Sequence, residues 1–163
     1  MTISTKMAEA INKQINNELF SGYLYLSAAI YLESKNFDGM ANWMKLQAKE
    51  EFGHGMKFYS YIMDRGGIVN LMNIDTPKSD WKSPLEVFEY AYGHEKKITE
   101  MIGGLVEIAK SENDVATLEM LNWFVKEQVE EEASASKITD KLKLVGDNAG
   151  GLFIIDGELG RRQ

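Results

Sequence analysis

The chain has 163 residues, a formal net charge of −7 at pH 7 and no cysteine. This length suffices for one domain with a sizeable core, and we expect a single domain over residues 1–163. The negative charge argues against nucleic acid or an anionic membrane as partner and favours cations, while the lack of cysteine excludes disulfides, thiolate metal sites and iron–sulfur clusters.

The amino terminus, MTISTKMAEAINKQ, lacks the apolar stretch and small-residue cleavage site of a signal peptide. No run of about 18 apolar residues is present that could span a membrane. We therefore expect a cytoplasmic protein with no membrane partner, and a cysteine-free chain fits that reducing compartment.

Helical periodicity covers most of the chain, and both prolines lie between residues 76 and 84. The first helix is predicted over about residues 4–34. A second helix follows a tight connection, with Asp38 as its predicted N-cap, and ends near Arg65 at a pair of glycines.

The sequence Ser83-Pro84-Leu85-Glu86 predicts the start of a third helix, because it offers an N-cap serine, a proline at the first helical position and a capping-box glutamate. This helix is predicted to end near Ser111. After a short break, a fourth helix is predicted to reach about Val145, so that the four helices fill about residues 4–145. A glycine-rich segment then precedes the short apolar stretch Leu152–Ile155.

The lengths of the connections predict the topology. Short links make the first and second helices, and the third and fourth, antiparallel neighbours. The connection Gly67–Ser83 has about 17 residues, which in extended form reach ~50 Å, enough to run back along a helix of ~27 residues. Such a crossover makes the second and third helices parallel. The predicted fold class is therefore all-α, a ferritin-like four-helix bundle with one long crossover.

Polar residues interrupt the predicted core-facing stripe of every helix. Core positions of bundle helices recur at spacings of three and four residues. In the fourth helix these positions are Leu121, Phe124, Gln128, Glu131, Ala135, Ile138, Leu142 and Val145. The stripe is thus apolar at both ends and polar in the middle. Over the four helices, the ligand-type residues at the interruptions are Glu18, Glu51, His54, Glu95, Gln128 and Glu131.

This set of side chains predicts a metal centre. Several buried carboxylates at one level repel each other unless cations lie among them. Four carboxylates and one imidazole suit iron or manganese and do not suit copper(I) or structural zinc. One inward carboxylate per helix, with Glu51 and His54 as an i, i+3 pair, is the arrangement of di-metal carboxylate bundles. Glu51 is the predicted bridge between two metals, each able to give one electron to dioxygen.

Each residue has a simpler explanation when taken alone. A lone E-x-x-H is more often a surface pair, and Glu18 alone fits an edge position. The acids Glu127, Glu130 and Glu132 are usually solvated on a helix face, and His94 falls off the stripe. Four independent stripes that fail mid-helix with ligand-type residues are not explained in this way.

The chain resembles the bacterial non-haem ferritins over essentially its whole length. The matching blocks are NNELFSGYLYLS, KEEFGHGM, YGHEKKIT and WFVKEQVEEEA, one in each predicted helix. The tail GLFIIDGELG is similar to the short fifth helix of that family, which we expect over about residues 149–159. The resemblance implies a ferroxidase that oxidises Fe(II) with dioxygen or peroxide. It also implies a homo-oligomeric shell, typically of twenty-four subunits, that stores ferric mineral.

The resemblance also implies three iron positions and an electron donor. Glu18, Glu51 and His54 match the first position. The second matches Glu51, Glu95 and Glu131, with Gln128 close by. The third matches Glu50, Glu127 and Glu130, and Tyr25 matches a tyrosine thought to supply an electron. Glu132 has no counterpart to which a role is assigned.

Two departures sharpen this expectation. Symmetric di-iron enzymes carry a second E-x-x-H, whereas the fourth helix has Gln128 and Glu131 at those positions, so the second metal is expected to be held more loosely. Phe52 stands where bacterioferritins have a haem-ligating methionine, and we therefore expect iron but no haem.

Two alternatives remain. One is a di-iron peroxidase or oxidase resembling rubrerythrins, against which the missing second E-x-x-H and the missing cysteines argue. The other is a non-catalytic, shell-forming subunit resembling ferritin light chains, against which the complete set of five ligands argues.

Overall fold

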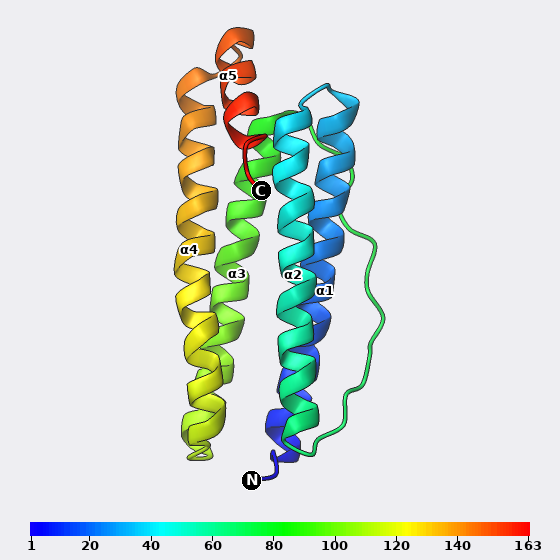
Figure 1. The fold of residues 1–163 in the computed structure, drawn as a ribbon, viewed down its shortest axis with the longest axis vertical. Coiled ribbons are helices and arrows are strands. Elements are labelled where there is room, and N and C mark those ends of the chain that lie inside the picture. Colours follow the sequence, from blue (N-terminus) through cyan, green and yellow to red (C-terminus); the bar gives the residue numbers. More distant parts are fainter.

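A computed structural model describes all of residues 1–163. It contains five helices and no strands: α1 (Thr5–Ser34), α2 (Asp38–Asp64), α3 (Pro84–Ser111), α4 (Val115–Val145) and α5 (Ala149–Leu159). The first four helices lie side by side as a long bundle, and α5 packs at one end of it (Figure 1). The predicted all-α bundle with one long crossover and a short fifth helix is confirmed.

The starts of two helices test the predicted caps. At α3, Ser83 Oγ accepts a hydrogen bond from Glu86 N over 3.1 Å, which confirms the predicted N-cap. The Glu86 carboxylate does not bond Ser83 N; it accepts from Lys82 N over 2.6 Å. At α2 the predicted N-cap was wrong, because Phe37 takes that position without a side-chain hydrogen bond. Asp38 is the first helical residue, where a carboxylate favours the positive end of the helix dipole.

The crossover runs along α1. Asn12 donates to Ile68 O over 2.9 Å and accepts from Asn70 N over 2.8 Å, while Ser27 Oγ donates to Lys78 O over 2.8 Å. The contacts therefore advance in the same direction along α1 and along the connection. This connection returns the chain to the starting end of α2, so α2 and α3 run parallel (Figure 1).

The core consists of two apolar clusters separated by a polar layer. One cluster includes Tyr25, Met44 and Phe88, and the other includes Phe58 and Phe124. The predicted stripe of the fourth helix is buried except for Val145, which is half-buried. None of the five helices combines the length and apolarity that a membrane span requires.

α5 is fixed closely against the start of α2. A Cβ added at Gly39 would lie 1.8 Å from the carbonyl oxygen of Asp156, so only glycine permits this approach. Asp156 also accepts a hydrogen bond from Met40 N over 2.8 Å. Ile155 and Leu159 are buried in the apolar cluster beside α5. The chain after α5 therefore starts from a defined point near α2.

Candidate metal centre

The polar layer brings the five predicted ligands together in the middle of the bundle. Glu18 and Glu51 are each 1% exposed, and none of the other three exceeds 7%. Their ligand atoms form groups in which all atoms lie within 4.8 Å of one another. The three groups are Glu18–Glu51–His54, Glu51–Glu95–Glu131 and His54–Glu127–Glu131. Glu51 belongs to the first two groups, which is the placement that a bridging ligand requires.

Two glutamine side chains, one on α1 and one on α2, orient carboxylates of the centre. Gln14 Nε2 donates to Glu18 Oε1 over 2.8 Å. Gln47 Nε2 donates to Glu131 Oε2 over 2.5 Å and lies 3.5 Å from Glu51 Oε1. Both amides therefore turn N–H groups toward the centre, which holds the carboxylate oxygens in place without adding charge.

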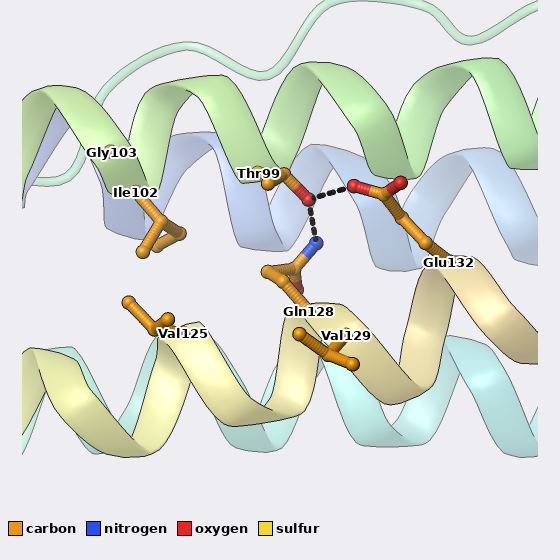
Figure 2. Close-up of a pocket in the computed structure, with 7 residues that line it drawn as sticks. All are labelled: Thr99, Ile102, Gly103, Val125, Gln128, Val129 and Glu132. Carbon is orange, nitrogen blue, oxygen red and sulfur yellow. Dashed lines mark hydrogen bonds between the residues drawn. The ribbon is translucent and has the colours of Figure 1, made fainter.

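A chain of hydrogen bonds leads from Glu95 to the surface between α3 and α4. Tyr25 donates its hydroxyl to Glu95 Oε1, and Gln128 Nε2 donates to Glu95 Oε2 over 3.2 Å. The same Gln128 nitrogen lies 3.4 Å from Thr99 Oγ1, which donates to Glu132 Oε1 over 2.5 Å (Figure 2). These residues border a groove of about 350 Å³ whose other wall is apolar. Glu132 thus supports Gln128 through the hydroxyl of Thr99.

The four carboxylates lack a cationic partner from the chain. Burial raises the pKa of Glu18 and of Glu51 well above the ordinary value, and repulsion from other carboxylates adds to this. Burial raises the pKa of Glu95 as well. Burial, followed by repulsion from Glu95, raises the pKa of Glu131 to about 7. The only ionic contact among the five is that of Glu51 with His54.

One oxygen shows most directly that the layer is incomplete. Glu18 Oε2 is buried and has no hydrogen-bond partner. Buried carboxylate oxygens are normally satisfied by donors or by metal ions, since a bare one costs free energy. The unsatisfied oxygen lies in the group that contains Glu51 and His54. The donor set therefore fits a divalent cation with a preference for oxygen ligands and one imidazole.

His54 is positioned between two carboxylates and two aromatic rings. Its Nδ1 lies 3.3 Å from Glu51 Oε2, and its Nε2 lies 3.9 Å from Glu127 Oε1. The imidazole meets the rings of Trp123 and Phe124 edge to face, at centroid distances of 5.5 and 6.0 Å. This packing fixes the ring plane, so both nitrogens face carboxylates.

The residues expected at a third iron position are not all brought together. Glu127 joins His54 and Glu131 in one group of possible ligands. Glu50 instead forms an ion pair with Arg162, in which Oε2 lies 2.5 Å from Nη2, and Glu130 is exposed on α4. Of the three, only Glu127 is therefore grouped with ligand atoms of the centre in this structure.

Sequence reasoning placed Gln47 on the inward stripe of the second helix without giving it a role, and it missed Gln14 and Arg162. Gln14 precedes Glu18 by four residues, and Gln47 precedes Glu51 by four. Residues at this spacing are neighbours on a helix surface, so the repeated Gln-x-x-x-Glu pattern was a usable signal. Arg162 offered no such signal, because it reaches the centre from the far end of the chain.

A four-helix bundle that sends a carboxylate inward from each helix at one level belongs to the class of di-metal carboxylate proteins. Comparison with known proteins narrows this class. Residues 8–145 match the sequence model of the Ferritin family, described as a ferritin-like domain. The bacterial non-heme ferritin of Bacteroides fragilis strain 638R is 48% identical over 160 residues, covering 98% of this chain and 99% of the relative.

A second relative and a solved structure agree with this match. The bacterial non-heme ferritin of Staphylococcus aureus strain MRSA252 is 39% identical, covering 98% of this chain and 96% of the relative. The open pore ferritin of the hyperthermophilic archaeon Archaeoglobus fulgidus superposes with a TM-score of 0.98 at 49% identity, covering 99% of this chain and 98% of that one. The chain belongs to the ferritin family, whose members bind and store iron.

Proposed function

We propose that the centre oxidises Fe(II), its substrate, with dioxygen or peroxide, and that the protein stores the ferric product. The observation that carries the proposal is a buried set of four carboxylates and one histidine that lacks a cationic partner from the chain. Glu18, Glu51 and His54 would hold the first iron. The second would be held by Glu51, Glu95 and Glu131.

The two proposed iron positions differ in their ligands. Such a difference suits iron that is a substrate and leaves the centre after oxidation. The second position has no histidine, and the amide N–H of Gln128 is turned toward Glu95. Gln128 therefore steadies a ligand and adds none of its own. Two Fe(II) ions held a few ångströms apart each lose one electron, and a two-electron acceptor such as dioxygen takes both. We propose that Tyr25, whose hydroxyl donates to Glu95, supplies a further electron.

We also propose that the chain assembles into a homo-oligomeric shell, with twenty-four subunits as the expected number. Tyr23, Leu26 and Phe52 are exposed at the α1–α2 face, around an apolar groove of about 640 Å³. On α5, Phe153 and Ile154 are 61% and 73% exposed. Exposed apolar surface of this extent favours burial against other copies. A monomer or simple dimer in sedimentation at micromolar concentration would contradict the shell.

Stopped-flow oxidation of Fe(II) tests the centre. His54→Ala and Glu131→Ala each remove a ligand, so the fast phase should slow by more than about 100-fold, beyond the usual effect of changing a supporting group. Glu107→Ala, which removes an exposed acid of α3, is the matched control and should oxidise iron at the wild-type rate. Unchanged rates in both ligand variants would exclude this centre.

A further inference from the structure

The guanidinium of Arg162 occupies a defined place beside the metal centre. Arg162 follows α5 by three residues, and its carbonyl oxygen accepts a hydrogen bond from Asn42 Nδ2 over 3.2 Å. Its guanidinium carbon lies 4.8 Å from the centroid of the Trp43 ring, a cation–π contact. Backbone and side chain are therefore both held against α2.

The same guanidinium contacts one residue of the polar layer and one acid outside it. Nη1 donates to Gln47 Oε1 over 2.8 Å, and Nη2 lies 2.5 Å from Glu50 Oε2. Gln47 in turn donates to Glu131 and faces Glu51. A single amide thus separates this cation from the buried carboxylates.

We propose that Arg162 is a positioning residue that regulates the outer, third iron position. It pairs with the Glu50 carboxylate and fixes the amide of Gln47, so a third iron binds with Glu50 only after displacing the guanidinium. This inference rests on the proposed function, because it adds an outer, third Fe(II) to the two that the centre is proposed to hold.

Two physical effects support the competition. Arginine remains charged at any working pH, so Glu50 always has a counter-ion until a metal replaces it. The guanidinium is tethered by α5 and stacked on Trp43, so it competes at the high effective concentration of an intramolecular group. Both effects lower the apparent affinity of the outer position for Fe(II).

The amide of Gln47 gives Arg162 a second effect on the centre. With its oxygen bonded to the guanidinium, the amide must present its N–H group to Glu131. A turned amide would place its oxygen against the carboxylate and leave two acceptors facing each other. Loss of Arg162 therefore frees this amide to turn.

Metal titration of variants tests the inference. Arg162→Met keeps an apolar stem over Trp43 but removes the charge and the donors, whereas Arg162→Lys keeps the charge and loses the two-pronged contact. Arg161→Met is the matched control, because Arg161 is the exposed neighbour on the same tail. Anaerobic calorimetry with Fe(II), together with metal occupancies in iron-soaked crystals, gives the number and affinity of the sites.

In Arg162→Met the outer position should bind Fe(II) about fivefold more tightly, the size of one favourable surface ion pair. Arg162→Lys should fall between this variant and wild type, and it carries the test if Arg162→Met fails to fold. Arg161→Met should leave the outer affinity unchanged. In a Glu50→Gln background, Arg162→Met should have no further effect on that affinity.

Two different failures are distinguishable. If wild type binds no pair of metals at the inner positions, the proposed function fails. If the inner pair is occupied but Arg162→Met leaves the outer affinity unchanged, or changes it equally in the Glu50→Gln background, only the role of Arg162 is overturned.

Discussion

Acids with low solvent exposure lie at one end of the bundle and in its middle. The acid at the end has a cationic partner from the chain, whereas those in the middle have none. At the end, Asp114 accepts two hydrogen bonds from Arg65, over 3.0 and 3.2 Å, and two more from Thr117. In the middle, four more deeply buried carboxylates have only amide, phenol and imidazole partners.

The presence or absence of a cationic partner distinguishes a structural carboxylate from a carboxylate that is suited to bind a metal. An ion pair whose partner is part of the chain is complete on folding and needs nothing further. Carboxylates that are buried without a cation raise the free energy of the metal-free fold, and an incoming ion removes that cost. Whether the chain supplies the counter-charge therefore distinguishes Asp114 from Glu131.

Glu131→Gln should give the largest effect on the stability of the metal-free protein. The folded-state pKa of Glu131 is raised from 4.5 to about 7, so the folded state binds more protons than the unfolded state between these values. The contribution of Glu131 to stability therefore falls as the pH rises from 4.5 through about 7 and is constant above that value. At pH 8 the variant should be more stable by about 3 kcal/mol, the free energy of such a shift.

Thermal unfolding of metal-free protein at several pH values measures this effect. Wild type should lose stability across that pH range more steeply than Glu131→Gln, and the two should converge near pH 4. A variant that is less stable than wild type at pH 8 would show that Glu131 is not strained by its neighbours.

Asp114→Ala should have the opposite sign and a smaller size. The substitution removes the N-cap of α4 and leaves Arg65 without its partner, so the metal-free protein should lose about 2 kcal/mol. Iron oxidation should stay near wild type, since Asp114 lies at the end of the bundle. Denaturant unfolding, with Asp140→Ala on the exposed face of α4 as control, checks the loss.

Thr99→Val should give the smallest effect. It removes the hydroxyl that links Glu132 to Gln128, so Gln128 loses a support and the second metal should bind up to about tenfold more weakly. Glu132→Gln keeps an oxygen acceptor for Thr99 and should bind metal nearly as wild type does. Anaerobic Fe(II) titration compares the two; equal affinities in Thr99→Val and wild type would mean that Gln128 needs no such support.

Helical periodicity predicted which acids face inward, because burial follows the spacing of three and four residues almost without exception. It placed Glu18, Glu51, Glu95 and Glu131 at one level, and all four are buried there. Their assignment to iron positions remains a prediction that metal binding must test.

The features that were not predicted depend either on residues far apart in the sequence or on a choice between two local backbone conformations. Periodicity could not show that Glu50 turns toward Arg162, because the two are 112 positions apart in sequence and meet only through the docking of α5. The start of α2 was misjudged by one residue, since Asp38 is equally compatible with a cap and with a first turn. Such choices are decided by tertiary packing.

The ligands of the centre come from two helical hairpins, one N-terminal and one C-terminal. Glu18, Glu51 and His54 lie on the hairpin of α1 and α2, which a short turn joins. Glu95 and Glu131 lie on the hairpin of α3 and α4, after the long crossover. The first group of ligands can thus assemble through local contacts, whereas the second needs closure of a long loop, a slower kind of folding event. The repulsion of Glu51 by Glu95 and Glu131 therefore arises only when the two hairpins dock.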